Sequence, residues 1–175
     1  MMRISYILLL AIVATLTQTV ATHALWFSSS VGWIGPILPA CVAVCMALYS
    51  RSAVDAALAG WILGFALELP LAGETMGVLS LLFAAGGATI YTMRDAFFRD
   101  RVITQAMLGF LFCLGIFEIS VLYSRVALPG SARSMGAAAL QVLLVAIYTG
   151  VFTPIVCAGL KPLHHWLWPA AVERR

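Results

Sequence analysis

Two carboxylates stand inside otherwise apolar segments, and these are the residues whose surroundings most favour chemistry. Glu68 follows GWILGFAL, and Glu118 lies within LGIFEISVLY. An unpaired ionised group surrounded by hydrocarbon costs about 2.5–3.5 kcal/mol on insertion scales, so each carboxylate needs a partner, a proton or water. Arg125 lies two turns beyond Glu118 on the same helical face and could reach back toward it. We treat Glu68, Glu118 and Arg125 as candidate intramembrane charges.

Three roles are open for the two carboxylates. If both carboxylates lie near the external surface of a membrane, they could stay hydrated. They could instead pair with Arg125, Arg133 or backbone donors and fix the packing of helices. A proton relay or a substrate site is the third role, but relays usually need several ionisable groups at matching depth, and only these two carboxylates are evident.

The segment around Glu68 also carries a pattern of small residues. Gly60 and Gly64 form a GxxxG pair, and Glu68 follows one turn later on the same face. Glycines at this spacing allow a second helix to approach closely. The pattern predicts that Gly60, Gly64 and Glu68 form a helix-packing face or a face for a protein partner.

The remaining reactive side chains form no catalytic or metal-binding pattern. All four cysteines lie within apolar runs, and adjacent His164 and His165 would point about 100° apart on a helix. Neither set favours a metal site. Neither a phosphate-binding GxxxxGK[ST] loop nor a dinucleotide-binding GxGxxG motif occurs. We therefore predict that the chain is not an enzyme and needs no cofactor or metal.

The composition predicts that membrane helices position these residues. The chain has 175 residues, of which 63% are hydrophobic and 10% charged, whereas soluble domains average about 45–50% apolar and about 25% charged. At about 20 residues per crossing, this length suits five to six spans. The net charge of +3 comes from basic residues at the ends of apolar runs, which argues against nucleic-acid binding.

The hydrophobic runs predict an all-α integral membrane protein, a single bundle of about six transmembrane helices. The expected helices cover about residues 4–25, 33–49, 53–71, 76–93, 102–123 and 135–160. A cytoplasmic interfacial tail over 161–175 follows them. The first run could be a cleaved signal peptide, but it outlasts the usual apolar core of about 7–15 residues, so we expect it to be retained. The second run is short for a membrane crossing. Three alternatives are open: the helix is tilted, it is extended toward residue 31, or it is broken near Pro36 and Pro39.

Basic residues gather at one set of helix ends. With six helices, Arg125 and Arg133 face one side, and the other side receives Arg3, Arg51, Arg94, Arg99, Arg101, Lys161, Arg174 and Arg175. The positive-inside rule then places both termini in the cytoplasm, in a multi-pass protein of the cytoplasmic (inner) membrane. Within this set, a basic cytoplasmic loop is predicted over residues 94–101, which contains Arg94, Arg99 and Arg101.

Four segments, in this order, resemble the MreD family of membrane proteins from the bacterial rod-shape system. The segments are Pro36 with its following apolar stretch, GWILGFALEL, MGVLSL at residues 76–81 and YTGVFTPIV at residues 148–156. In the second segment Gly60, Trp61 and Gly64 occupy the family's glycine and aromatic places. Glu68 stands where Asp is usual, which keeps the charge and lengthens the side chain by one methylene.

The resemblance implies a non-enzymatic scaffold of the cell-shape and peptidoglycan elongation complex, the elongasome. Its partners would be a single-span protein resembling MreC, an MreB-like filament, RodA with a class B penicillin-binding protein, and the lipid bilayer. The family's fold is similar to the six-helix substrate-binding subunit of energy-coupling-factor vitamin transporters, which supplies the alternative function. Those subunits tend to carry an AxxxA face on the first helix, whereas the first run here has Ala11 and Ala14 without that spacing. This difference favours the scaffold.

Overall fold

Six α-helices make up most of the described structure, and a small two-stranded hairpin joins the first two. The computed structural model describes residues 4–25, 27–29, 32–69, 77–94, 101–127 and 135–163. The elements are α1 (Ile4–Leu25), β1 (Phe27–Ser29), β2 (Gly32–Ile34), α2 (Leu38–Tyr49), α3 (Ala53–Glu68), α4 (Val78–Met93), α5 (Val102–Ala127), α6 (Met135–Leu160) and the 3-10 helix η3 (Lys161–Leu163). The structure thus has the all-α character and the six helices that the sequence predicts.

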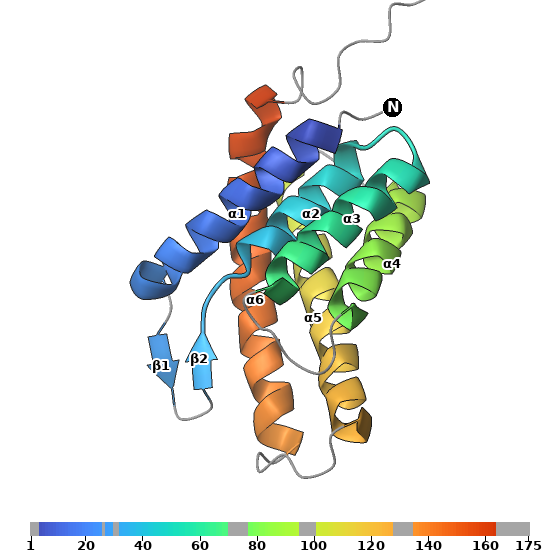
Figure 1. The fold of residues 1–175 in the computed structure, drawn as a ribbon. Coiled ribbons are helices and arrows are strands. Elements are labelled where there is room, and N and C mark those ends of the chain that lie inside the picture. Colours follow the sequence, from blue (N-terminus) through green and yellow to red (C-terminus); the bar gives the residue numbers. More distant parts are fainter. Residues whose placement is uncertain are drawn as a thin grey trace, which may run out of the picture.

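The helices form two hairpins with a short helix between them (Figure 1). α3 packs along α4, and α5 packs along α6, whereas α2 contacts both pairs and also α1. Every residue of α2 from Pro39 to Leu48 is buried. The centre of the bundle is therefore a helix of only 12 residues, enclosed by the other five.

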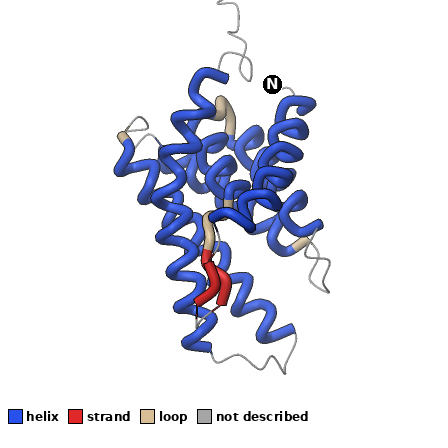
Figure 2. The backbone as a smooth tube through the Cα atoms, turned by 90° about the vertical axis from the view of Figure 1, so that its left-hand side faces the viewer, coloured by secondary structure: helices blue, strands red, loops and turns tan. Residues whose placement is uncertain are grey.

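The strands β1 and β2 form an antiparallel pair beside α6. Phe27 pairs with Ile34 and Ser29 with Gly32, and Gly32 has a φ of +135°, which favours glycine at the first position of β2. The Phe27 ring meets the Tyr148 ring of α6 edge to face, with 6.3 Å between ring centroids. Figure 2 shows the hairpin in red along the outside of the helices. The aromatic contact thus attaches the hairpin to α6.

The second helix begins later than the sequence pattern predicts. A helix over 33–49 was expected, but residues up to Ile34 form β2, the chain is non-helical over 35–37, and α2 starts at Leu38. Pro36 lacks an N–H donor and biases the residue before it toward an extended conformation. Pro39 then occupies the first turn of α2, where proline is favourable. Of the three alternatives, the prolines therefore produce a break.

The other helix ends follow the sequence more closely. α1 and α6 have the predicted bounds, and α5 continues to Ala127 rather than ending at 123. α3 begins after Ser52, whose side chain accepts a 3.0 Å hydrogen bond from the Asp55 N–H. It ends at Glu68, earlier than the predicted 71. Residues 70–76 and 164–175, which include parts of the predicted third and fourth helices and most of the tail, lie outside the described residues.

Among the residues that the structure describes, two helices are long and apolar enough to cross a membrane by length and composition. These are α5 over Val102–Val126 and α6 over Met135–Leu160. With 26 residues each, they are about 39 Å long, against about 30 Å for the hydrocarbon core of a bilayer. α3 and α4 have 16 residues each, or about 24 Å. The helices of the bundle therefore differ widely in length.

Candidate functional site

Gly60 and Gly64 lie where α3 packs against the backbone of α4. A Cβ atom on Gly60 would collide with the carbonyl oxygen of Phe83, and one on Gly64 would lie 2.8 Å from the Cα of Ser80. α4 contributes a glycine of its own, because a Cβ on Gly87 would lie 2.8 Å from the carbonyl oxygen of Ala56. The predicted glycine face is therefore covered by α4 of the same chain.

Glu68 is buried, with 6% of its surface exposed, and its carboxylate meets the beginning of α4. Oε1 accepts a 2.6 Å hydrogen bond from the Leu79 N–H. Oε2 accepts hydrogen bonds from the Gly77 N–H at 2.9 Å and from the Ser80 hydroxyl at 2.5 Å. Of the three roles open for this residue, the contacts correspond to bonding with backbone donors.

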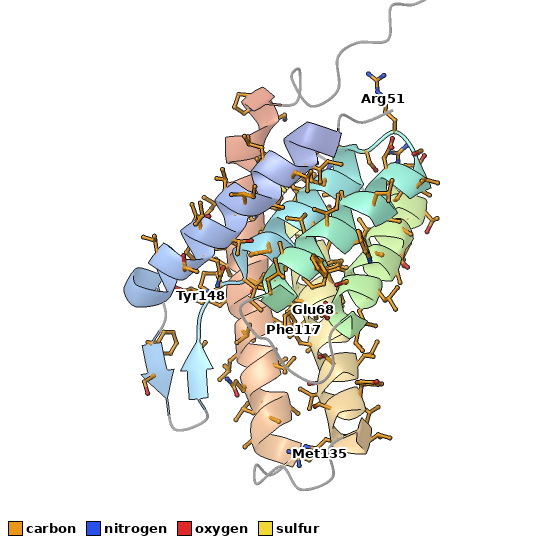
Figure 3. The ribbon with its side chains drawn as sticks, in the orientation of Figure 1. Arg51, Glu68, Phe117, Met135 and Tyr148 are labelled. Atoms are coloured by element: carbon orange, nitrogen blue, oxygen red, sulfur yellow. The ribbon has the colours of Figure 1, made fainter. Side chains whose placement is uncertain are left out.

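This carboxylate takes the place of a missing N-cap side chain. The N-cap residue of α4 is Gly77, which has a φ of +98° and no side chain with which to cap the helix. N-cap side chains usually accept the N–H of the second or third helical residue, and Leu79 is the second. A negative charge is also favourable at a helix N-terminus because of the helix dipole. Glu68, labelled in Figure 3, therefore stabilises the start of α4 from the end of α3.

The start of α2 is stabilised in the same way by two other helices. Gln18 of α1, which is buried, accepts a 2.8 Å hydrogen bond from the Leu38 N–H and donates one of 3.1 Å to the Pro36 carbonyl. The Thr149 hydroxyl of α6 accepts a 3.1 Å hydrogen bond from the Ile37 N–H. A buried non-helical segment is stable only when its backbone N–H and C=O groups have such partners. Gln18 lies between Thr17 and Thr19, and Thr149 lies within YTGVFTPIV. Nothing in their spacing indicates which of these polar residues bonds to another helix.

The opposite ends of α2 and α4 are joined through Arg94, at the start of the predicted basic loop. Its guanidinium donates a hydrogen bond to the carbonyl of Ser50, the C-cap residue of α2, and lies 4.1 Å from the centroid of the Tyr91 ring. The Tyr91 hydroxyl donates a 2.9 Å hydrogen bond to the Arg51 carbonyl. A cation is favourable at a helix C-terminus. Arg101 is exposed, and Arg99 lies outside the described residues.

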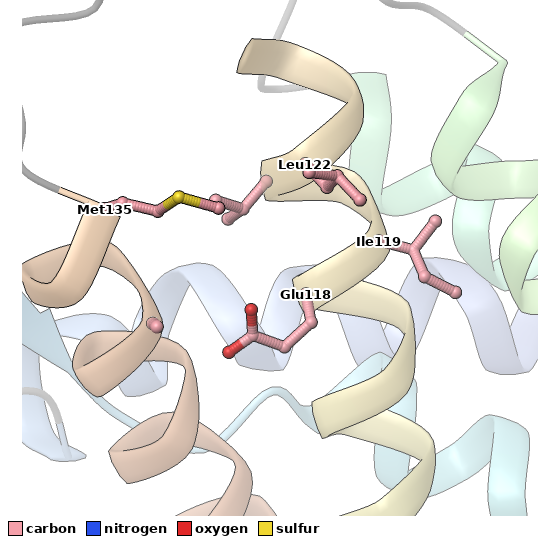
Figure 4. Close-up of a pocket in the computed structure, with 6 residues that line it drawn as sticks. Glu118, Ile119, Leu122 and Met135 are labelled. Atoms are coloured by element: carbon pink, nitrogen blue, oxygen red, sulfur yellow. The ribbon is translucent and has the colours of Figure 1, made fainter. Parts of the chain in front are cut away.

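Glu118 has a different environment from Glu68. It is half-buried and lines a cleft of about 220 Å³ between α5 and α6, together with Ile119, Val121, Leu122, Met135 and Ala139. Figure 4 shows its carboxylate pointing from α5 toward α6. Within the described part of the chain, it makes no hydrogen bond or ion pair, whereas Arg125 does interact with a neighbour. The approach of Arg125 to Glu118 therefore stays a prediction.

The segment GWILGFALEL of α3 meets the segment MGVLSL at the start of α4. GWILGFALEL supplies Gly60, Gly64 and Glu68, and MGVLSL supplies the three hydrogen-bond donors that Glu68 binds. No known protein family, curated protein or solved structure matches this chain. The segments GWILGFALEL and MGVLSL form one packed unit in the structure.

The four cysteines, which lie within apolar runs of the sequence, are buried inside the bundle. All four are buried and unbonded to one another by disulfides. The Cys41 thiol donates a 3.6 Å hydrogen bond to the Thr149 carbonyl and accepts one of the same length from the Thr153 hydroxyl. Among the described residues, no group of three or more His, Cys, Asp or Glu side chains could hold a metal ion. The contacts of Cys41 link α2 to α6.

On α6, small and hydroxyl residues are buried and large apolar residues are exposed, which is the reverse of a helix in a water-soluble protein. Its buried positions include Ala146, Gly150 and the hydroxyl residues Thr149 and Thr153. Its exposed positions carry large apolar side chains at a spacing of three or four residues: Leu140, Leu143, Ile147, Val151 and Ile155. A soluble helix buries its apolar stripe, whereas membrane helices pack through small and hydroxyl residues and turn apolar side chains outward.

Proposed function

We propose that this chain is a non-enzymatic membrane scaffold of the MreD type, acting in the complex that controls cell shape and peptidoglycan elongation. The observation that supports this most is the α3–α4 unit, in which the two family-like segments pack together through Gly64, against Leu79 and Ser80. Glu68 occupies the acidic place of the family motif and stabilises the start of α4. A carboxylate used in this way contributes to rigidity, and a scaffold needs a rigid surface for its partners.

The proposal places six spans in the cytoplasmic membrane. The lengths of α5 and α6 and the outward apolar side chains of α6 support insertion. α1 adds a second lipid-facing surface, since exposed side chains along it include Leu9, Leu16 and Val20. The short helix α2 completes its crossing through the non-helical residues 35–37, whose backbone is bonded to Gln18 and Thr149. Such irregular backbone is tolerated at membrane depth only where protein encloses it.

Both termini face the cytoplasm in this proposal. Figure 3 places Arg51 at the same end of the bundle as the start of α1 and the end of α6, and Met135 at the opposite end. Arg94 is bonded to Ser50 and therefore lies at the Arg51 end as well. The basic residues favour the cytoplasmic side for that end.

A partner helix must bind a surface that the chain leaves open. Because α4 covers Gly60 and Gly64, the accessible part of α3 is its outer face, where Trp61 and Phe65 stack with 5.9 Å between ring centroids. These rings are 46% and 41% exposed. A single-span protein resembling MreC is the proposed main partner, with an MreB-like filament and RodA with its penicillin-binding protein in the same assembly.

Photocrosslinking in native membranes tests this function. A crosslinking amino acid at Trp61 should capture a single-span protein. The same amino acid at Leu63, which is 0% exposed, should capture no partner and serves as the matched control on α3. Capture of an ATPase module with its coupling subunit, instead of a single-span protein, would reject the scaffold in favour of a vitamin-transporter subunit.

A further inference from the structure

The cleft beside Glu118 has one charged group and otherwise apolar walls. Ile119, Leu122 and Met135 line it, and each is more than half exposed, so the cleft opens to the outside of the bundle. A carboxylate near the membrane needs a counter-charge or hydrogen-bond donors. The occupant that matches this lining carries one cationic donor group next to hydrocarbon.

The cleft lies at one end of an exposed apolar stripe along α5. Met107, Leu111 and Ile119 are about half exposed, and Gly115 between them is exposed, with open space beside its Cα. Residues spaced by four share one helical face, and the rise from Met107 to Ile119 is about 18 Å. One leaflet of the hydrocarbon core is about 15 Å thick, half of the whole core. The stripe is long enough to lie along one acyl chain.

We propose that this cleft binds an aminophospholipid, with the primary ammonium of the headgroup on the Glu118 carboxylate and an acyl chain along the stripe of α5. An ammonium group has three N–H donors, whereas the quaternary nitrogen of a choline headgroup has none. Glu118 would repel a purely anionic headgroup.

The proposal rests on the membrane location argued above, but not on the scaffold function. Lipid binding requires only that α5 and α6 face the bilayer. Two results can therefore be separated: a chain that does not insert into bilayers contradicts the membrane location, whereas an inserted chain without headgroup preference contradicts only the lipid site.

Native mass spectrometry of the full chain tests the site. The protein is reconstituted in nanodiscs with equal parts of phosphatidylethanolamine, phosphatidylcholine and phosphatidylglycerol, and the lipids retained after release are counted. We expect phosphatidylethanolamine to exceed each other lipid by about fivefold, the ratio that about 1 kcal/mol produces. Glu118→Gln should abolish this excess. Asp55→Asn, which removes a carboxylate from the first turn of α3, should retain it.

A second variant separates loss of binding from loss of folding. Ala139→Leu fills the cleft from the α6 side and leaves Glu118 unchanged, so it should also abolish the excess. Every variant is first checked for the parent's melting temperature. The proposal is overturned if the parent shows no headgroup preference or if Glu118→Gln retains it. It is also overturned if Glu118→Gln instead loses a copurifying protein, because the cation in the cleft would then be a protein side chain.

Discussion

The Ser80 hydroxyl, in the first turn of α4, donates a 2.5 Å hydrogen bond to the Glu68 carboxylate at the end of α3. The same carboxylate accepts the N–H groups of Gly77 and Leu79. Three donors therefore converge on one buried anion, and all of them belong to the segment that begins α4. The bond holds two consecutive helices together at the ends where they are joined.

Replacing Glu68 with Gln should lower the stability of the bundle. The amide nitrogen of Gln is a donor, so at least one of the three donors at the start of α4 would lose its acceptor. We expect a loss of about 1.5–3 kcal/mol, the range for hydrogen bonds to charged groups. Thermal unfolding of the detergent-solubilised protein would show it as a lower apparent melting temperature.

A matched pair of serine variants isolates the hydroxyl contribution. Ser80→Ala removes a donor to the buried anion, whereas Ser124→Ala removes a hydroxyl that bonds only to the Val121 carbonyl of its own helix. We expect Ser80→Ala to lower the melting temperature more. Equal effects of the two substitutions would contradict the capping role of Glu68.

Enlarging Gly64 should disrupt the contact between α3 and α4. A Cβ atom there would lie 2.8 Å from the Ser80 backbone and 2.9 Å from the Cβ of Phe83, and overpacking of this kind costs about 1–3 kcal/mol. Gly64→Ala should therefore reduce the melting temperature and the amount of protein in the membrane. The control is Gly115→Ala on α5, which meets no atom within 4 Å and should be tolerated because alanine favours helix. A Gly64→Ala protein as stable as Gly115→Ala would disprove the close approach.

Removing the polar partners of α2 should destabilise the break before that helix. Thr149→Val keeps the side-chain shape but leaves the Ile37 N–H buried without an acceptor, at a cost of about 1–3 kcal/mol. The control is Thr17→Val, since the Thr17 hydroxyl bonds only to carbonyls of its own exposed helical turn. Hydrogen exchange at Ile37 provides the local measurement. Unchanged exchange in Thr149→Val would show that another group accepts this bond.

Cysteine labelling in spheroplasts tests the orientation of the bundle. The four native cysteines are buried, so background labelling by a membrane-impermeant maleimide should be low. Ser28→Cys, in the exposed part of β1, should react from outside. Arg51→Cys, at the opposite end (Figure 3), should react only after lysis. The reverse result would invert the topology, and reaction of both from outside would contradict six spans.

The local sequence determined where most helices lie. α1 and α6 have the predicted bounds because each is a long apolar run with limits set by neighbouring polar, charged or glycine-containing segments. The glycine pair on α3 also indicated a close helix contact, since small residues one turn apart share a face whatever packs against it. These features depend on residues close together in the chain.

Only the tertiary structure decided which polar groups bond to one another. The Thr149 and Thr15 hydroxyls look alike in the sequence, but Thr15 bonds to the Ala11 carbonyl of its own helix, whereas Thr149 bonds to Ile37, 112 residues away. The three hydrogen-bond donors of Glu68 are likewise determined by the packing of α3 against α4. Helix ends buried inside a bundle must find hydrogen-bond partners, and the three-dimensional arrangement of the helices determines which side chains lie within reach.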